Sequence, residues 1–263
     1  MGKTTTAVNL AASLAVAEQR TLLVDADPQG NATSGVGLDR GEVAGEGASL
    51  YDVLLGEASA AEARRRSVLF PTLDVLASTP DLAGAEVELV DRAGRAERMR
   101  EALAGVRDAY DYVLIDCPPS LGLITLNMLA AADALIIPVQ CEYYALEGLS
   151  QLLDTVRRVQ QGVNPRLAIA GVLLTMYDAR LNLSRQVAAD ARDYFGAQVF
   201  QTVIPRNVRL AEAPSFGKPI ALYDVASVGA QAYMAVAEEL MQRQGAGAAS
   251  AGAPAVAAVE GGR

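Results

Sequence analysis

The first six residues, MGKTTT, combine residue types that bind phosphate. Gly2 lets backbone N–H groups approach a phosphate, Lys3 can reach the β- and γ-phosphate oxygens, and the Thr4 hydroxyl can ligate Mg²⁺. An apolar run with helical spacing, from Ala7 to Leu14, follows directly. The motif therefore lies at a helix N-terminus, where the helix dipole and the free amides favour an anion. It corresponds to the second half of a phosphate-binding loop.

Two apolar segments farther along the chain each end in aspartate. Residues 20–27 (RTLLVDAD) end in Asp25 and Asp27, and residues 110–116 (YDYVLID) end in Asp116. Ligands of open α/β folds bind at the carboxyl ends of the strands. Asp116 is thus expected to hold Mg²⁺ through water beside the phosphate loop. Asp25 and Asp27 can serve a metal or position a water; the alternative is a solvated turn that caps a helix.

Composition excludes several classes of function. The chain has 263 residues, of which 51% are hydrophobic and 20% are charged, as expected for one globular domain or at most two. It contains no histidine, which excludes a Ser-His-Asp triad and a His-ligated metal. The net charge of −9 argues against a generally basic nucleic-acid binder, so DNA binding would need a local basic patch. No apolar run reaches about 18 residues, so no membrane span is expected.

Apolar strand patterns alternate with helical patterns along the chain. We expect helices over residues 49–55, 57–66, 81–109, 121–131, 147–161, 182–195 and 226–243, and strands over 73–76, 133–139, 167–175 and 199–204 besides the two above. This alternation predicts an α/β fold with a doubly wound, mostly parallel sheet. Residues 1–243 are expected to form one domain. The Ala/Gly-rich tail, 244–263, has no aromatic residue and is expected to stay disordered.

Four longer motifs give the chain a resemblance to the ParA/Soj partition ATPases, which are P-loop NTPases with a deviant Walker A loop. The motifs are VDADPQGNATSGVG (24–37), YDYVLIDCPPSLGL (110–123), EYYALEGL (142–149) and VIPRNVRLAEAPSFGKPI (203–220). The resemblance covers nearly everything from Gly2 to about Met241. It implies a P-loop NTPase-like fold and hydrolysis of ATP to ADP and phosphate.

The resemblance also assigns roles to residues of this chain. Phosphate binding falls to the turn residues Gly2, Lys3, Thr4 and Thr5, and the metal shell to Thr4, Asp25 and Asp116. Asp27 would orient the attacking water, with Lys3 as the second catalytic residue. Pro205 and Asn207 match positions that meet the adenine. The implied cofactors are ATP and Mg²⁺.

The chain departs from the family at its start. The family loop reads K-G-G-x-G-K-T, and Met1 stands at the x position, so the first Lys, two Gly and the strand before them are missing. One hypothesis is a mis-set start, because a GUG valine codon can be read as an initiator; a stop codon just before Met1 would contradict this hypothesis. For a chain that begins at Met1, we expect poor ATP binding and a sheet without a central strand.

The resemblance further implies partners. ATP-loaded dimers of the family bind DNA without sequence preference, and Arg180 and Arg209 match the positions used, with Arg185 and Arg206 nearby. Without the resemblance, these would be read as ordinary solvated arginines. A ParB-type centromere-binding protein is the expected stimulator of hydrolysis. A cytoplasmic, nucleoid-associated location follows, with chromosomal or plasmid cargo left open.

Three alternatives remain. A MinD-like division-site ATPase would need a C-terminal amphipathic membrane helix, and residues 244–263 contain no Lys and no bulky apolar face. An iron–sulfur carrier ATPase would need paired cysteines, whereas Cys117 and Cys141 lack C-x-x-C spacing and fit small buried hydrophobic positions. A truncated, nucleotide-incompetent regulator is the non-enzymatic alternative.

Overall fold

A seven-stranded sheet forms the centre of the molecule, in the strand order β2-β3-β1-β4-β7-β5-β6. The computed structural model describes residues 2–142, 145–245 and 255–258. The strands are β1 (Thr21–Asp25), β2 (Arg64–Arg66), β3 (Leu73–Leu76), β4 (Tyr112–Asp116), β5 (Ala134–Gln140), β6 (Ala168–Thr175) and β7 (Ala255–Ala258). All pairings are parallel except that of β2 with β3. The predicted α/β sheet is therefore confirmed.

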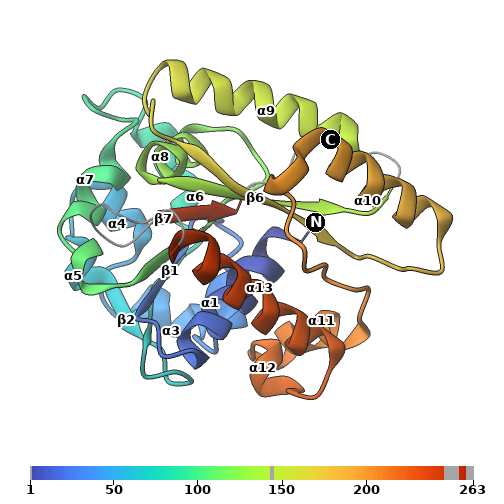
Figure 1. Cartoon of the computed structure of the whole chain (residues 1–263). Helices are drawn as coiled ribbons and strands as arrows, with labels where there is room; N and C mark the ends of the chain where they lie inside the picture. Colours follow the sequence, from blue (N-terminus) through green and yellow to red (C-terminus); the bar gives the residue numbers. More distant parts are fainter. Residues whose placement is uncertain (1, 143–144, 246–254, 259–263) are drawn as a thin grey trace.

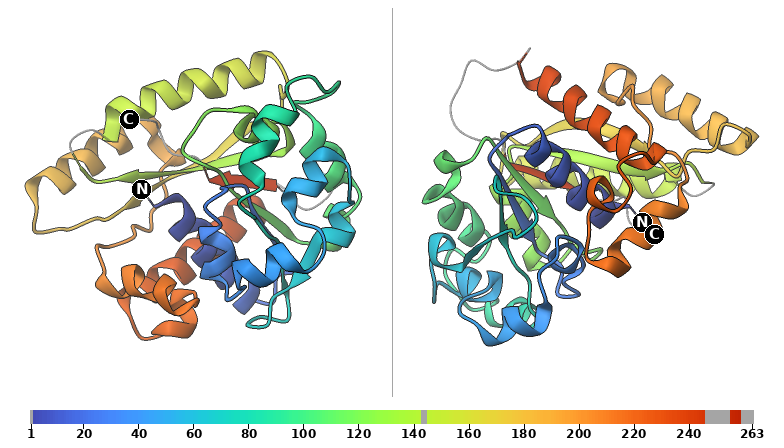
Figure 2. Two further views of the ribbon diagram at one scale, coloured as in Figure 1. Left: turned by 180° about the vertical axis from the view of Figure 1, so that it is seen from behind. Right: turned by 90° about the horizontal axis from the view of Figure 1, so that it is seen from below.

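Helices cover both faces of this sheet (Figures 1 and 2). The helices are α1 (Lys3–Val16), α2 (Asn31–Gly35), α3 (Arg40–Gly45), α4 (Leu50–Leu55), α5 (Ala60–Ala63), α6 (Leu82–Glu88), α7 (Arg98–Ala104), α8 (Leu123–Ala131), α9 (Ala145–Gln161), α10 (Asn182–Phe195), α11 (Val208–Glu212), α12 (Ile220–Tyr223) and α13 (Val228–Gly245). One apolar cluster packs α1 and α13 against one face of the sheet. A second cluster packs the helices from α4 through α10 against the other face. No helix in these ranges is both long and apolar enough to cross a membrane.

Helix α1 connects the start of the chain to its distant C-terminal part. The hydroxyls of Thr6 and Tyr233 lie 3.2 Å apart in a buried hydrogen bond between α1 and α13. The side chain of Asn9 accepts a hydrogen bond from the backbone N–H of Ile220 at 2.7 Å and donates one to the Thr5 carbonyl. These bonds fix α1 on the sheet.

Three of the expected elements differ in the structure. The expected helix over 57–66 ends at Ala63, because Arg64–Arg66 pair antiparallel with β3 and form the edge strand β2; Arg64 and Arg66 lie 3.6 and 3.9 Å from Asp74 on β3. The expected helix over 81–109 is broken into α6, α7 and a 3₁₀ turn, with Gly94 at a positive φ of 67° between the helices.

The expected strand over 199–204 is absent from the described sheet. Only single bridges form there, at Val199 and Pro205. The N–H groups of Gln201 and Thr202 donate to the carboxylate of Glu239 instead, at 2.8 and 3.0 Å. A side chain of α13 thus takes the hydrogen bonds that a neighbouring strand would have accepted.

The structure of the C-terminal tail differs most from the expectation. Residues 244–263 were expected to be disordered, yet Ala255–Ala258 form strand β7 between β4 and β5, with every residue buried. The expected gap at the centre of the sheet is filled by this segment, so both expectations are wrong for these four residues. Helix α13 ends at Gly245, and residues 246–254 and 259–263 lie outside the described part of the chain.

The Asn9 bond gives the fold's first prediction. Replacing Asn9 by Ala leaves the buried N–H of Ile220 without its acceptor, so the free energy of unfolding should fall by about 1–3 kcal/mol. Urea denaturation measures this change. Val16→Ala, at a half-exposed position at the end of the same helix, should change stability by less than about 0.5 kcal/mol. Equal effects of the two substitutions would contradict the assignment.

Candidate functional site

The phosphate turn begins with a glycine in a conformation that other residues rarely adopt. Gly2 has a φ of 109° and precedes the first residue of α1. A Cβ atom there would lie 3.4 Å from the Thr175 hydroxyl oxygen, at the end of β6. No described side chain caps α1, and its first turn contains no acid. The N-terminal N–H groups of the helix therefore face an anion site without a competing carboxylate.

Lys3 is buried at the start of α1, with 9% of its surface exposed, and Thr4 and Thr5 are half-buried. The ammonium group of Lys3 is near enough to Asp116 to lower the pKa of that carboxyl group. Charges that are buried in the protein interior are costly unless an opposite charge compensates them. The structure thus brings the predicted lysine and acid together.

Asp25 ends β1 and is completely buried. One carboxylate oxygen accepts from both the N–H and the hydroxyl of Thr33 at 2.7 Å, and the other accepts from the Asp27 N–H at 3.2 Å. Burial is the main cause that raises the pKa of Asp25 from 3.8 to about 6, against the lowering effect of these bonds. Asp25 is consequently a well-fixed acid whose proton is easily lost when a cation arrives.

Asp116 ends β4 and is Asp25's register neighbour on the adjacent strand. Its side chain has 0% exposure, and neither carboxylate oxygen has a partner at hydrogen-bond geometry. Burial, and next the nearby Asp25 carboxylate, raise the pKa of Asp116 well above 3.8. The Thr4 hydroxyl and the Lys3 ammonium act in the opposite direction and lower this pKa in part. Buried carboxylate oxygens without hydrogen-bond partners fit a position that a cation can occupy.

Asp27 lies just beyond the strand, half-buried in the turn that follows β1. Its carboxylate accepts from the Gln29 N–H at 2.9 Å, and its charge contributes to the raised pKa of Asp116. The carboxyl groups of Asp25, Asp27 and Asp116 therefore gather around the Lys3 turn. Their individual roles in binding and catalysis remain predictions.

The donor set fits Mg²⁺. Magnesium prefers oxygen ligands and is usually held by one or two carboxylates together with phosphates and waters. Thr4, Asp25 and Asp116 supply one hydroxyl and two carboxylates, and the orphaned oxygens of Asp116 are the observation that supports the fit. Within the described ranges, no three His, Cys, Asp or Glu residues are grouped to hold a metal by themselves. The remaining ligands would have to come from phosphate and water.

Pro205 and Asn207 lie on the same edge of the sheet as the phosphate turn. Thr175, which contacts Gly2, is followed by Tyr177, and Tyr177 pairs with Pro205 through a bridge with hydrogen bonds of 3.0 Å on either side. Asn207 caps α11 by accepting from the Arg209 N–H at 2.7 Å. Their proximity to an adenine stays a prediction.

The predicted DNA-binding arginines are exposed and ion-paired. Arg180 pairs with Asp178 at 2.7 Å and has a side chain that is 87% exposed. Arg209 pairs with Glu212 at 2.9 Å and with Asp224 at 3.5 Å. Arg206 pairs with Glu142 at 3.0 Å and contributes to lowering the pKa of Asp178, so it lies near the Arg180 turn.

Sequence reasoning missed Thr33 and Thr175. Thr33 fixes Asp25, and its hydroxyl also accepts from the Ser78 N–H at 3.0 Å, which connects the site to the end of β3. Thr175 contacts the phosphate turn from β6. Thr33 is part of the VDADPQGNATSGVG motif, which could have singled it out, whereas Thr175 carries no local signal.

Asp116 gives a prediction that separates stability from ligand binding. Asp116→Asn removes a carboxyl group whose folded-state pKa is raised, so the nucleotide-free protein should become more stable. In the unfolded chain, the Asp116 carboxyl group ionises near pH 4. Above that pH, the folded state must either keep the proton or bury the charge, and the free-energy cost of doing so increases as the pH rises toward the folded-state pKa. The gain in melting temperature should therefore be larger at pH 8 than at pH 5. A lower melting temperature at both pH values would contradict this.

Comparisons with known proteins show the family of this chain. Residues 1–169 match the family model described as an AAA domain. A chromosome partitioning protein ParA of Myxococcus xanthus is 56% identical over 247 residues, which cover 92% of this chain and 84% of that protein. A chromosome-partitioning ATPase Soj of Treponema pallidum is 51% identical, with 93% and 94% covered.

A solved structure extends the agreement to the fold. Cobyrinic acid a,c-diamide synthase from Mycobacterium smegmatis, determined with bound ADP and magnesium, superposes with a TM-score of 0.80 at 38% identity. The match covers 94% of this chain and 91% of that one. This chain has a mostly parallel sheet, a lysine-threonine turn and two neighbouring strands that end in aspartate. It belongs to the ParA/Soj family of chromosome-partitioning ATPases, within the P-loop NTPase fold.

Proposed function

We propose that this protein hydrolyses ATP with Mg²⁺ and that its ATP-bound dimer binds DNA without sequence preference. A ParB-type partner would stimulate hydrolysis and so release the dimer from the nucleoid, in the cytoplasm. One observation carries the nucleotide part of this proposal: Asp116 is fully buried beside Lys3, Thr4 and Asp25, and its oxygens lack partners. Such a site is costly unless a cation and its phosphates occupy it.

The residues of the site have different roles in phosphoryl transfer. Gly2 and the α1 N-terminus, together with Lys3 and the hydroxyls of Thr4 and Thr5, bind the phosphate oxygens and hold them at the sheet edge. Thr4, Asp25 and Asp116 would hold Mg²⁺, which supplies positive charge against the phosphate oxygens. Asp27, in the turn beyond β1, orients a water for attack on the terminal phosphorus. The proton that this water loses moves toward the Asp27 carboxylate.

Pro205 and Asn207 support adenine binding by their place. Pro205 forms the bridge with Tyr177, two residues beyond the end of β6, and Asn207 follows it two residues later; Thr175, at the end of β6, lies close to the phosphate turn. A nucleotide whose phosphates lie on α1 would extend its base along this edge of the sheet.

Arg180 and Arg209 are the candidates for DNA contact. Both side chains are exposed, and a DNA phosphate could take the place of their carboxylate partners, Asp178 and Glu212. The net charge of −9 makes such a local patch necessary, because the protein's overall field repels DNA. Dimer formation would double the number of arginines that face the duplex. Chromosome and plasmid DNA would bind equally well through phosphates.

The catalytic role of Asp27 can be tested with one atom changed. Asp27→Asn keeps the acceptor for Gln29 but loses the charge that attracts the water proton, so hydrolysis should fall by at least about 100-fold. Binding of ATP with Mg²⁺, measured by calorimetry, should change little. Asp39→Asn is the control, because Asp39 is another acid in a turn that accepts from backbone N–H groups. Equal turnover by wild type and Asp27→Asn would contradict the role.

The DNA-binding role can be tested through its salt dependence. Arg209→Glu should abolish ATP-dependent DNA binding and leave ATP binding intact. Each phosphate contact that is lost lowers the slope of log affinity against log salt concentration by about 0.9. Arg157→Glu is the matched control: Arg157 is an equally exposed, ion-paired arginine on α9. Fluorescence anisotropy with duplexes of two unrelated sequences gives the affinities. Unchanged DNA binding by Arg209→Glu would refute the assignment, and binding to anionic vesicles in place of DNA would favour the MinD-like alternative.

A further inference from the structure

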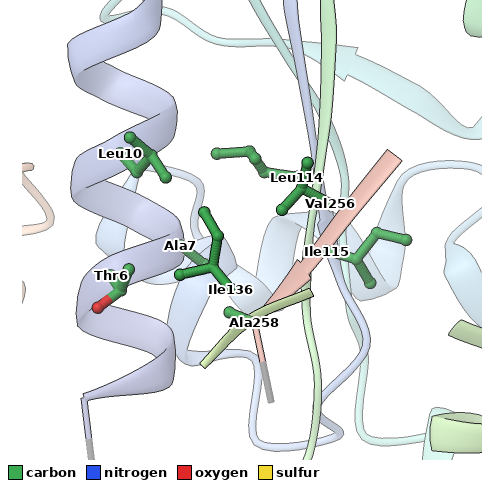
Figure 3. A pocket seen from close by; sticks show the side chains of 8 residues that line it. All are labelled: Thr6, Ala7, Leu10, Leu114, Ile115, Ile136, Val256 and Ala258. Carbon is green, nitrogen blue, oxygen red and sulfur yellow. The ribbon is translucent and has the colours of Figure 1, made fainter. Parts of the chain in front are cut away.

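The segment 117–122 connects Asp116, at the end of β4, to the start of α8. The first end of this segment is firmly held. The Asp116 carbonyl accepts from the Ala26 N–H at 2.9 Å. Leu114, two residues earlier on β4, lines the same small apolar cavity as Leu10 of α1 (Figure 3). The conformation of the segment therefore depends on how its other end, at the start of α8, is held.

Glu86 of α6 holds the start of α8. Its two carboxylate oxygens accept from the N–H groups of Leu123 and Ile124, the first two residues of α8, at 3.1 and 3.2 Å. The first N–H groups of a helix have no acceptor within the helix itself. The first turn of α8, residues 123–125 (LIT), contains no acid, and Gly122 before it has no side chain. Glu86 thus supplies, from another helix, the cap that the sequence of α8 lacks.

Gly122 leaves the space that this contact needs. Its φ of −86° and ψ of −167° are extended values that other residues also adopt, so the backbone conformation does not require glycine here. A Cβ atom on Gly122 would overlap both carboxylate oxygens of Glu86. The glycine therefore serves the close approach of Glu86, and a methyl group in its place would push the carboxylate away from the helix end.

The helix that carries Glu86 is well anchored. The side chains of Leu82, Ala85 and Leu89 on α6 are 0% exposed. They belong to the same apolar cluster as Ile124, in the first turn of α8. Glu86 is thus a fixed point for α8 on a packed helix.

The first turn of α8 is connected back to the segment. Thr125, which is 1% exposed, donates its hydroxyl to the Ser120 carbonyl at 2.6 Å. Pro118 and Pro119 precede Ser120, and proline fixes the backbone φ, so this stretch is stiff. A shift of the first turn of α8 would therefore move Ser120 and, through the two prolines, act on Asp116.

We propose that Glu86 is a positioning residue for hydrolysis: by holding the start of α8 it fixes the segment 117–122, and with it the placement of Asp116 against the phosphate turn. Glu86 acts through α8 and does not touch the nucleotide. The catalytic part of this inference rests on the proposed function, and the hold on the segment does not. Because the α1 turn supplies most of the phosphate contacts, loss of Glu86 should affect turnover more than ATP binding.

Two substitutions remove the contact from opposite sides. Glu86→Ala deletes the acceptor, and Gly122→Ala places a methyl group where the carboxylate lies. Each should lower kcat for ATP hydrolysis about tenfold or more, because small misplacements are costly in the transition state, and should leave KM for ATP within about twofold. The double variant should be no slower than Glu86→Ala alone, because both changes remove the same contact. Additive losses would overturn the proposal.

Two further variants separate positioning from stability. Glu86→Gln keeps one carbonyl oxygen that can accept from the helix end, so it should recover most of kcat. Glu88→Ala is the matched control, because Glu88 lies on the same helix but accepts from the Tyr51 hydroxyl, at 2.9 Å, and it should leave kcat unchanged. All assays are run well below each melting temperature. A lowered melting temperature of Glu86→Ala with wild-type kcat would refute the positioning role.

A fluorescent reporter tests the hold on the segment without nucleotide. The chain contains no tryptophan, and Leu121 is 56% exposed, so Leu121→Trp introduces a single reporter into the segment. Its anisotropy should be lower in the Glu86→Ala background than in the wild-type or Glu88→Ala background, because the segment then moves more freely. Equal anisotropy in the three backgrounds would show that Glu86 does not hold the segment.

The outcomes separate this inference from the proposed function. If the full chain hydrolyses no ATP, the proposed function fails, and a lower anisotropy in the Glu86→Ala background still supports the hold on the segment. If the full chain hydrolyses ATP and Glu86→Ala turns over as fast as wild type, the proposed function stands and the positioning role is refuted.

Discussion

The structure depends on a pair of buried carboxylates at the carboxyl edge of the sheet. Asp25 and Asp116 are register neighbours on adjacent strands, and both have 0% exposure. Two like charges in this position oppose folding, and the protein offsets only one of them: Thr33 donates twice to Asp25, while Asp116 lacks hydrogen-bond partners. Local rules of this kind are typically broken at functional sites. The nearby ammonium of Lys3 is a partial remedy, since it lowers the pKa of Asp116 without reversing the effect of burial.

The rest of the fold can be understood as the means of holding this edge. Helix α1 brings Lys3 to the acids, and its position is fixed from three directions: by Tyr233 on α13, by the Ile220 backbone, and by the sheet below. The central strand of that sheet is the alanine-rich segment Ala255–Ala258, which lies between β4 and β5.

The sequence was most informative where structure is decided locally. Helix α10 has the predicted bounds, α4 begins after its predicted cap Ser49, and β1 and β4 end at the predicted Asp25 and Asp116. These elements carry their own apolar period, cap or terminal acid. The errors concern segments whose partners are distant in sequence. Arg64–Arg66 pair with β3, the N–H groups of residues 201 and 202 donate to Glu239 on α13, and Ala255–Ala258 pair with β4 and β5. No composition rule contains these partners.

The ion pairs of the surface arginines limit the energy that the proposed DNA contact can supply. Arg180 and Arg206 both act on Asp178, whose pKa falls to about 2, and Arg209 is shared by Glu212 and Asp224. A DNA phosphate would replace one anion by another at each arginine, so a single exchange contributes little direct energy. The gain comes from released counterions, and it grows with the number of phosphates engaged at once. In an acidic protein, affinity for DNA therefore requires several arginines in fixed relative positions, which a nucleotide-dependent dimer would supply and a monomer would not.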